Sequence, residues 1–198
     1  MGQYYNILLK PESAKRWQLY DRSVDGKYQP AKLTEHSWIG NYTLECVMEL
    51  LRKEPSKLVW IGDYAASYTV PDCKTKAPNS LTDKDIESLF KKAWGSKAYK
   101  AKTLNSAERC SDKDIYIVNH DKGEFLDLNA YMLQYGLDDG WIPHPLSLLT
   151  ALGNGFGGGD YCGNDKEYIG RWAGDKLSVE KAEPPVWFNG ILPRFKEE

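Results

Sequence analysis

The chain has 198 residues, a length typical of one domain rather than two. Its apolar content of 41% and charged content of 27% are those of a globular protein with a hydrophobic core. The net charge of −2 at pH 7 argues against a general nucleic-acid binder. We therefore expect one globular domain over residues 1–198, and we do not expect nucleic acid as a partner.

The start of the chain lacks the apolar core of a signal peptide, because charged residues interrupt it from Lys10 to Arg16. No apolar run approaches the length of a membrane-spanning helix. These features predict a cytoplasmic protein without a membrane partner. The cysteines are widely spaced, none forms Cys-x-x-Cys, and there are only three histidines, so we expect no metal and no cofactor.

The N-terminal half carries three clear local signals. Residues 4–9 (YYNILL) are β-prone and predict an early strand. Asn41 is a good N-cap for a helix whose apolar residues recur with helical spacing at Leu44, Val47, Met48 and Leu51. Residues 58–64 (LVWIGDY) predict a second strand. The stretch 12–34 between these signals indicates a hairpin or an irregular excursion.

A capping box from Thr82 to Asp85 predicts another helix, which Gly95 should end. Residues 115–118 and 124–128 flank a turn and form the best hairpin signal in the chain.

Further elements are expected towards the C-terminus. Residues 129–136 and 145–152 indicate two short helices, and residues 169–173 and 176–179 indicate two strands. The tail still carries Trp187, Phe188 and Phe195 and is expected to pack back onto the domain. Strands and helices without regular β-α alternation predict an α+β fold, with a mixed, mainly antiparallel sheet and two or more packed helices.

The densest glycine stretch, residues 153–159, follows the expected helix 145–152. Gly153, Gly155 and Gly158 match the spacing of a dinucleotide fingerprint, but that motif requires a strand before it and a helix after it. The order is reversed here, so we reject a Rossmann site. Two interpretations remain: a loop whose backbone N–H groups bind an anion, and a plain connection between elements.

If this loop is a binding site, its residues and their neighbours should contact the ligand. The candidate ligand-binding residues are Gly155, Gly157, Gly158, Gly159, Asp160, Tyr161 and Trp172. A catalytic site would instead need histidines close to carboxylates. The candidates for that role are His36, His144, Asp63 and Asp175, although none of their spacings is diagnostic.

Several motifs together resemble a family of uncharacterised proteins from bacteria and phages. They are the MGQYY start, His36-Ser-Trp-Ile-Gly, Trp60-Ile-Gly-Asp-Tyr, Val118-Asn-His-Asp-Lys, the stretch from His144-Pro-Leu to Gly159-Asp-Tyr, and Gly170-Arg-Trp-Ala-Gly-Asp. The resemblance implies no catalytic residues, because the family has no assigned activity. Its glycine loop reads GNGRGGGDY, and Phe156 replaces that arginine here, which weakens the anion-binding interpretation.

Two functions from different classes are therefore carried forward. The first is a non-catalytic binding protein that uses the glycine-loop region to bind a small ligand or a protein partner, for example as an immunity-like or phage counter-defence factor. The second is a hydrolase that uses His and Asp residues on the same face. If His36, His144 and two aspartates converge in a cleft, the hydrolase is favoured.

Overall fold

The computed structural model describes residues 3–21, 31–65, 81–95, 102–103, 115–135, 142–153 and 164–195. The strands are β1 (Tyr4–Pro11), β2 (Gln18–Asp21), β3 (Ala31–Lys32), β4 (Ser56–Gly62), β5 (Lys102–Thr103), β6 (Tyr116–Asn119), β7 (Glu124–Asp127), β8 (Ala151–Leu152), β9 (Lys176–Glu180) and β10 (Asn189–Gly190). The helices are α1 (Tyr42–Lys53), α2 (Asp83–Trp94), α3 (Leu128–Leu133) and α4 (Pro145–Leu149), with short 3-10 turns at Leu33–Glu35 and Lys166–Tyr168.

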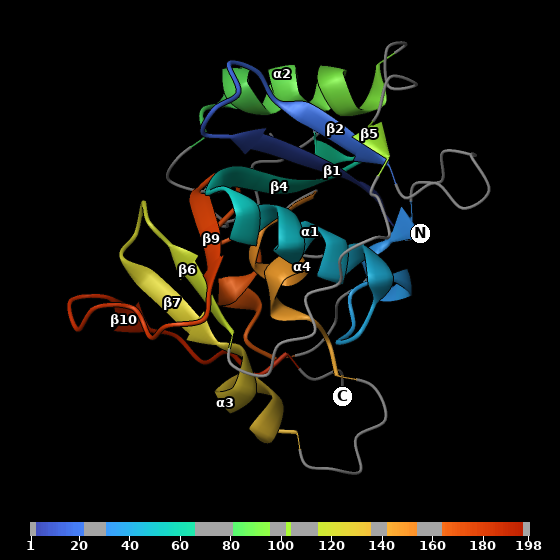
Figure 1. The fold of residues 1–198 in the computed structure, drawn as a ribbon. Helices are drawn as coiled ribbons and strands as arrows, with labels where there is room; N and C mark the ends of the chain where they lie inside the picture. The colour runs from blue at the N-terminus through green and yellow to red at the C-terminus, as the bar shows by residue number, and fades with distance from the viewer. Residues whose placement is uncertain are drawn as a thin grey trace.

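The ten strands of the described residues join one mixed, mostly antiparallel sheet (Figure 1), and together with the helices packed on it they confirm the predicted α+β fold. The strand order is β10-β7-β6-β9-β4-β1-β2-β5, while β3 pairs with β1 and β8 pairs with β4. The parallel pairs are β10 with β7, β2 with β5 and β8 with β4.

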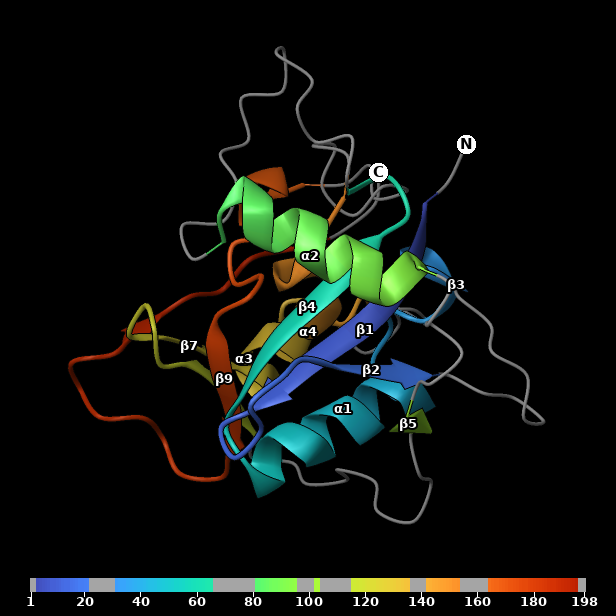
Figure 2. The same cartoon turned by 90° about the horizontal axis from the view of Figure 1, so that it is seen from above.

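The central strands β1 and β4 are buried on both faces. Ile7 and Trp60 belong to the core cluster that includes the apolar residues of α1, whereas Leu8 and Val59 belong to the cluster around α2. Successive side chains of a strand point to opposite faces, so this alternation places α1 and α2 on opposite sides of the sheet. Figure 2 shows the same arrangement, with α2 lying across β4 and β1.

The two long helices begin where their capping residues predict. The Asn41 side chain accepts a hydrogen bond from the Thr43 N–H, and the apolar residues of α1 predicted from helical spacing are buried. The Thr82 hydroxyl accepts from the Asp85 N–H, and the Asp85 carboxylate accepts from the Thr82 N–H. These side-chain hydrogen bonds pair N–H groups at the start of each helix that have no partner within the helix.

The predicted hairpin is confirmed as β6 and β7, but its surroundings depend on distant segments. β9 pairs with β6 on one side and with β4 on the other, so it connects the hairpin to the centre of the sheet. Residues more than fifty positions apart therefore meet, and Asn119 pairs with Leu177. The polar side chains described below lie at this junction.

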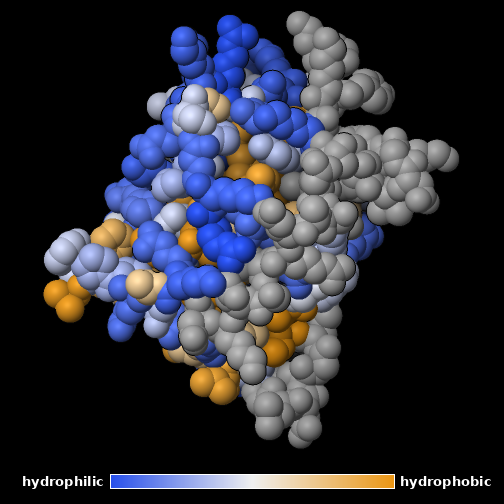
Figure 3. Space-filling view, viewed as in Figure 1, coloured by the Kyte–Doolittle hydropathy of each residue, from blue (hydrophilic) through white to orange (hydrophobic). Residues whose placement is uncertain are grey.

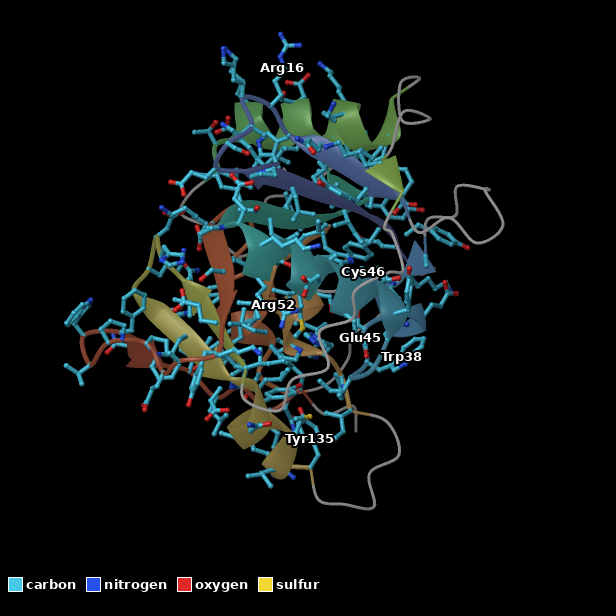
Figure 4. The ribbon with its side chains drawn as sticks, in the orientation of Figure 1. Arg16, Trp38, Glu45, Cys46, Arg52 and Tyr135 are labelled. Atoms are coloured by element: carbon cyan, nitrogen blue, oxygen red, sulfur yellow. The ribbon has the colours of Figure 1, made fainter. Side chains whose placement is uncertain are left out.

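Three C-terminal expectations need correction. The helix predicted over residues 145–152 ends at Leu149, and Ala151–Leu152 form β8, which pairs with β4. Residues 169–173 form turns rather than a strand, because the N–H groups of Gly170 and Trp172 donate to the carbonyls of Leu148 and Leu149, the last two residues of α4. The tail packs back only in part. Phe195 is fully buried, and its carbonyl accepts from the Tyr135 hydroxyl, labelled in Figure 4, but Trp187 is exposed.

Candidate functional site

His36 is a buried structural residue. Its Nε2 lies 2.7 Å from the indole nitrogen of Trp60, and its Nδ1 lies 2.7 Å from the carbonyl oxygen of Lys32. An indole N–H can only donate, so Nε2 accepts and Nδ1 carries the proton that is donated to the carbonyl. Both nitrogens of the neutral ring are thus used, and neither is open to a metal or to a substrate proton.

His144 is the N-cap of α4 and is also buried. Its Nδ1 accepts from the Leu146 N–H at 3.1 Å, and its Nε2 lies 3.1 Å from the Met48 sulfur. Burial lowers the pKa of His144 to about 3. The ring is therefore neutral near pH 7, and the nitrogen that could take up a proton already caps the helix, which argues against a general-base role.

Asp63 and Asp175 lie at opposite ends of β4. Asp63 follows the last residue of the strand, and its Oδ1 accepts from the Tyr4 N–H at 3.2 Å. The Asp175 carbonyl accepts from the N–H of Leu58 near the start of the strand. A strand of seven residues spans about 20 Å. The structure therefore does not bring these two carboxylates together.

Asp175 is completely buried and forms an ion pair. Its Oδ2 accepts from Lys122 Nζ at 2.7 Å and from Asn119 Nδ2 at 2.8 Å. The Asn119 Oδ1 accepts from the N–H groups of Asp121 and Lys122, both at 3.0 Å, so the turn that carries the lysine is itself fixed. This cluster ties the β6–β7 hairpin to the segment before β9.

Trp172, predicted to offer a flat face to a ligand, is instead a fully buried core residue. Its indole N–H donates to Glu124 Oε2 at 2.7 Å, and Arg171 binds both oxygens of the same carboxylate. Burial opposes ionisation of Glu124, but hydrogen bonds from Arg171 and Trp172 outweigh it and hold the pKa of Glu124 below its ordinary value. Glu124 is accordingly an ionised anchor for these two side chains.

The remaining ligand-binding candidates lie outside the described residues. They are Gly155, Gly157, Gly158, Gly159, Asp160 and Tyr161. The described chain before them ends at β8, where Leu152 pairs with Ile61 near the C-terminal end of β4. Gly153, the last described residue before these candidates, therefore follows a strand beside the end of β4 that Asp63 follows, and Asp175 lies near the other end.

His120 lies in the turn predicted between residues 118 and 124, and its ring contacts a serine of β9, a contact that the sequence does not predict. His120 Nε2 lies 2.8 Å from Ser178 Oγ, as in a nucleophile–base pair. However, the Ser178 hydroxyl donates to Glu180 Oε1 at 2.7 Å, and Ser178 is 4% exposed. The carboxylate therefore holds the serine instead of orienting the histidine, so the three residues lack the order of a catalytic triad.

Among the described residues, the most exposed apolar side chain lies in a segment that was expected to pack back onto the domain. We call residues 184–192 the edge segment; its sequence is PPVWFNGIL and it contains β10. Val186 is 98% exposed, Trp187 74% and Leu192 49%. Figure 3 shows a mainly hydrophilic face with hydrophobic atoms at the tip of the projection that carries β10. The sequence offered only a weak signal for this segment, because residues 140–159 form a longer stretch without Asp, Glu, Lys or Arg.

The backbone of the edge segment is held in place. The N–H of Asn189 donates to the Gly123 carbonyl and that of Ile191 to the Phe125 carbonyl, both at 2.8 Å. The Phe188 ring packs edge-on against His120 with ring centres 6.3 Å apart. The exposed side chains are thus presented on a fixed framework.

Comparisons with models of known protein families, with curated proteins and with solved structures find no match to this chain. Among the described residues, no three His, Cys, Asp or Glu side chains gather into a group that could hold a metal ion. Nor is any helix in the described part of the chain long and apolar enough to cross a membrane.

Proposed function

We propose that the protein is a non-catalytic binding protein that contacts a protein partner through the edge segment. The observation that carries this proposal is the exposure of Val186 and Trp187 in a turn that leads directly into β10. The Phe188 N–H closes this turn on the Pro185 carbonyl, and β10 pairs with β7. Exposed tryptophan is costly in water, and tryptophan is the residue type most enriched at binding hot spots. A preorganised backbone lowers the entropy lost on binding.

The glycine loop stays as a second candidate binding region, and the immunity-like or counter-defence role stays a prediction. The hydrolase alternative receives less support. The nitrogens of His36 and His144 are engaged within the core, Asp63 and Asp175 lie at opposite ends of β4, and Ser178 donates to Glu180.

Site-specific photo-crosslinking tests the proposal. A photoreactive phenylalanine analogue at Trp187 should give a discrete adduct in extracts of the organism that carries the gene. The matched control is the same analogue at Leu133 on α3, which is 80% exposed and also apolar. Wild-type protein should compete for the adduct, and Trp187→Ala should not. Equal adducts at both positions, or none at Trp187, would refute the proposal.

A further inference from the structure

We propose that a row of lysines at one end of the sheet binds an acidic segment of a partner protein. The lysine row consists of Lys10 on β1, Lys57 on β4 and Lys176 on β9. It lies next to His120, whose N–H donates to the Lys176 carbonyl and whose ring contacts Phe188 of the edge segment. The row shares no residue with the edge segment, so this inference goes beyond the proposed function.

The register of three antiparallel strands aligns the row. Lys57 lies directly opposite Lys10 on one side and directly opposite Lys176 on the other. Residues in such positions have Cβ atoms about 4.5–5.5 Å apart, and their side chains lie on one face of the sheet. That face is the one covered by α2, because Val59, two residues after Lys57, packs in the cluster around α2. β1 ends, and β4 and β9 begin, on the same side of the molecule (Figure 1).

The three like charges repel one another. Opposite charges directly across from each other stabilise a sheet, whereas like charges in those positions destabilise it. Neither Lys10 nor Lys57 forms an ion pair with a described residue, and Lys176 pairs only with Glu12, at 3.6 Å. All three lysines are partly exposed, so their ammonium groups are accessible to a partner.

Carboxylates near the row are engaged elsewhere. Asp85 accepts hydrogen bonds from the N–H and the hydroxyl of Thr82 at the start of α2. These bonds, and to a smaller extent the charge of Lys57, lower the pKa of Asp85. Glu180, beside His120, accepts from the Ser178 hydroxyl. The described surroundings therefore neutralise the row only in part, and carboxylates of a partner supply the complementary charge.

The dimensions of the row favour an extended chain over a single small anion. Neighbouring strands lie about 4.8 Å apart, so the backbones at Lys10 and Lys176 are about 10 Å apart. Bringing all three ammonium groups to one small anion would crowd like charges. An extended polypeptide covers the same distance in about three residues and offers each lysine its own carboxylate. The net charge of −2 argues against nucleic acid as the occupant.

Binding of a short, labelled oligoglutamate peptide, followed by fluorescence anisotropy, tests the inference. Affinity should fall about fivefold with Lys57→Gln and about tenfold or more with the double variant Lys10→Gln/Lys57→Gln. The matched control is Lys92→Gln, because Lys92 is exposed near the end of α2 and its loss changes the net charge equally. There we expect a change of less than about twofold, because the charge lies far from the row and is screened by salt. Equal affinities for all these proteins would overturn the inference.

Thermal unfolding separates a binding role from a structural one. Lys57→Gln relieves repulsion within the row, so its Tm should equal or exceed that of the wild type. A lower Tm would mean that the fold needs this charge, and would overturn the inference.

Competition identifies the class of ligand. Inorganic phosphate or a short oligonucleotide that displaces the peptide as well as unlabelled oligoglutamate does would make a small anion or a nucleic acid the occupant and overturn the inference. Trp187→Ala keeps every lysine and should bind the peptide like the wild type. Failure of the lysine row therefore leaves the crosslinking test of the edge segment unaffected.

Discussion

Trp60 and Trp172, each the first residue of a Trp-x-Gly-Asp sequence, are both fully buried and both donate their indole N–H to a buried polar side chain at 2.7 Å. The acceptor is the neutral ring of His36 for Trp60 and the carboxylate of Glu124 for Trp172. By itself, the repeated tetrapeptide predicts two equivalent strand ends. Trp60 lies within β4, however, and Trp172 lies in the turns before β9. The two residues therefore have in common a hydrogen bond from a buried indole N–H, and they do not occupy equivalent positions in the sheet.

Replacing either tryptophan with phenylalanine should destabilise the fold. Trp172→Phe removes a hydrogen bond to a charged group, which costs about 1.5–3 kcal/mol, and Trp60→Phe leaves a buried nitrogen unpaired, which costs about 1–3 kcal/mol. The smaller ring adds a cavity term in both cases. Denaturant midpoints measure these costs. The control is Trp187→Phe at an exposed site, which should change stability by less than about 0.5 kcal/mol. Equal effects at all three positions would contradict this account.

His144 should make the protein less stable in mild acid. Its pKa is about 3 in the folded state and 6.5 in the unfolded chain, so below pH 6.5 the unfolded state takes up a proton that the folded state does not. Stability from this group is therefore complete above pH 6.5 and falls by about 1.4 kcal/mol per pH unit below it, down to about pH 3.

The matched variant is His144→Asn, because asparagine is also a good N-cap and does not titrate. Between pH 7 and 5 its free energy of unfolding should fall less steeply than that of the wild type. The pKa of Glu124 is lowered, so that carboxylate stays ionised in this window and does not contribute to the difference. Parallel stability curves for the two proteins would show that His144 is protonated in the folded state.

The ion pair between Lys122 and Asp175 should be strongly coupled. Lys122→Met leaves a carboxylate that is completely buried without its cation, a change that costs about 3–5 kcal/mol. Adding Asp175→Asn should recover part of this loss, so the double variant should be more stable than the sum of the single effects predicts. Lys176→Met is the control, because Lys176 pairs with Glu12 at the surface and should cost less than about 1 kcal/mol. Additive effects in the cycle would refute the coupling.

Gly170 and Gly123 separate two reasons for requiring glycine. Both have a positive φ, +71° and +61°, which disfavours any side chain. A Cβ at Gly170 would also lie 2.5 Å from the Ala151 carbonyl oxygen, whereas a Cβ at Gly123 meets nothing within 4 Å. We expect Gly123→Ala to cost about 1 kcal/mol and Gly170→Ala clearly more, since the backbone must move. Thermal unfolding of the two variants under one condition gives the comparison, and a larger effect at Gly123 would contradict it.

Local signals in the sequence determined the elements whose causes are local. Asn41 and Thr82 begin α1 and α2 because their side chains reach N–H groups within three residues. The hairpin at residues 116–127 forms across a short turn. Composition and periodicity were therefore sufficient to predict the fold class and most of the central elements.

The tertiary structure alone decided what depends on contacts between distant residues. β9 lies between β6 and β4, and β8 is parallel to β4, so strands far apart in the sequence become neighbours in the sheet. The indole N–H of Trp60 occupies Nε2 of His36, and the ammonium group of Lys122 pairs with the carboxylate of Asp175. Neither partner could be predicted from local sequence. Trp172 and Trp187 are the same residue type fifteen positions apart, yet one is buried on a carboxylate and the other is exposed at a sheet edge, since burial is set by which distant surface covers a side chain.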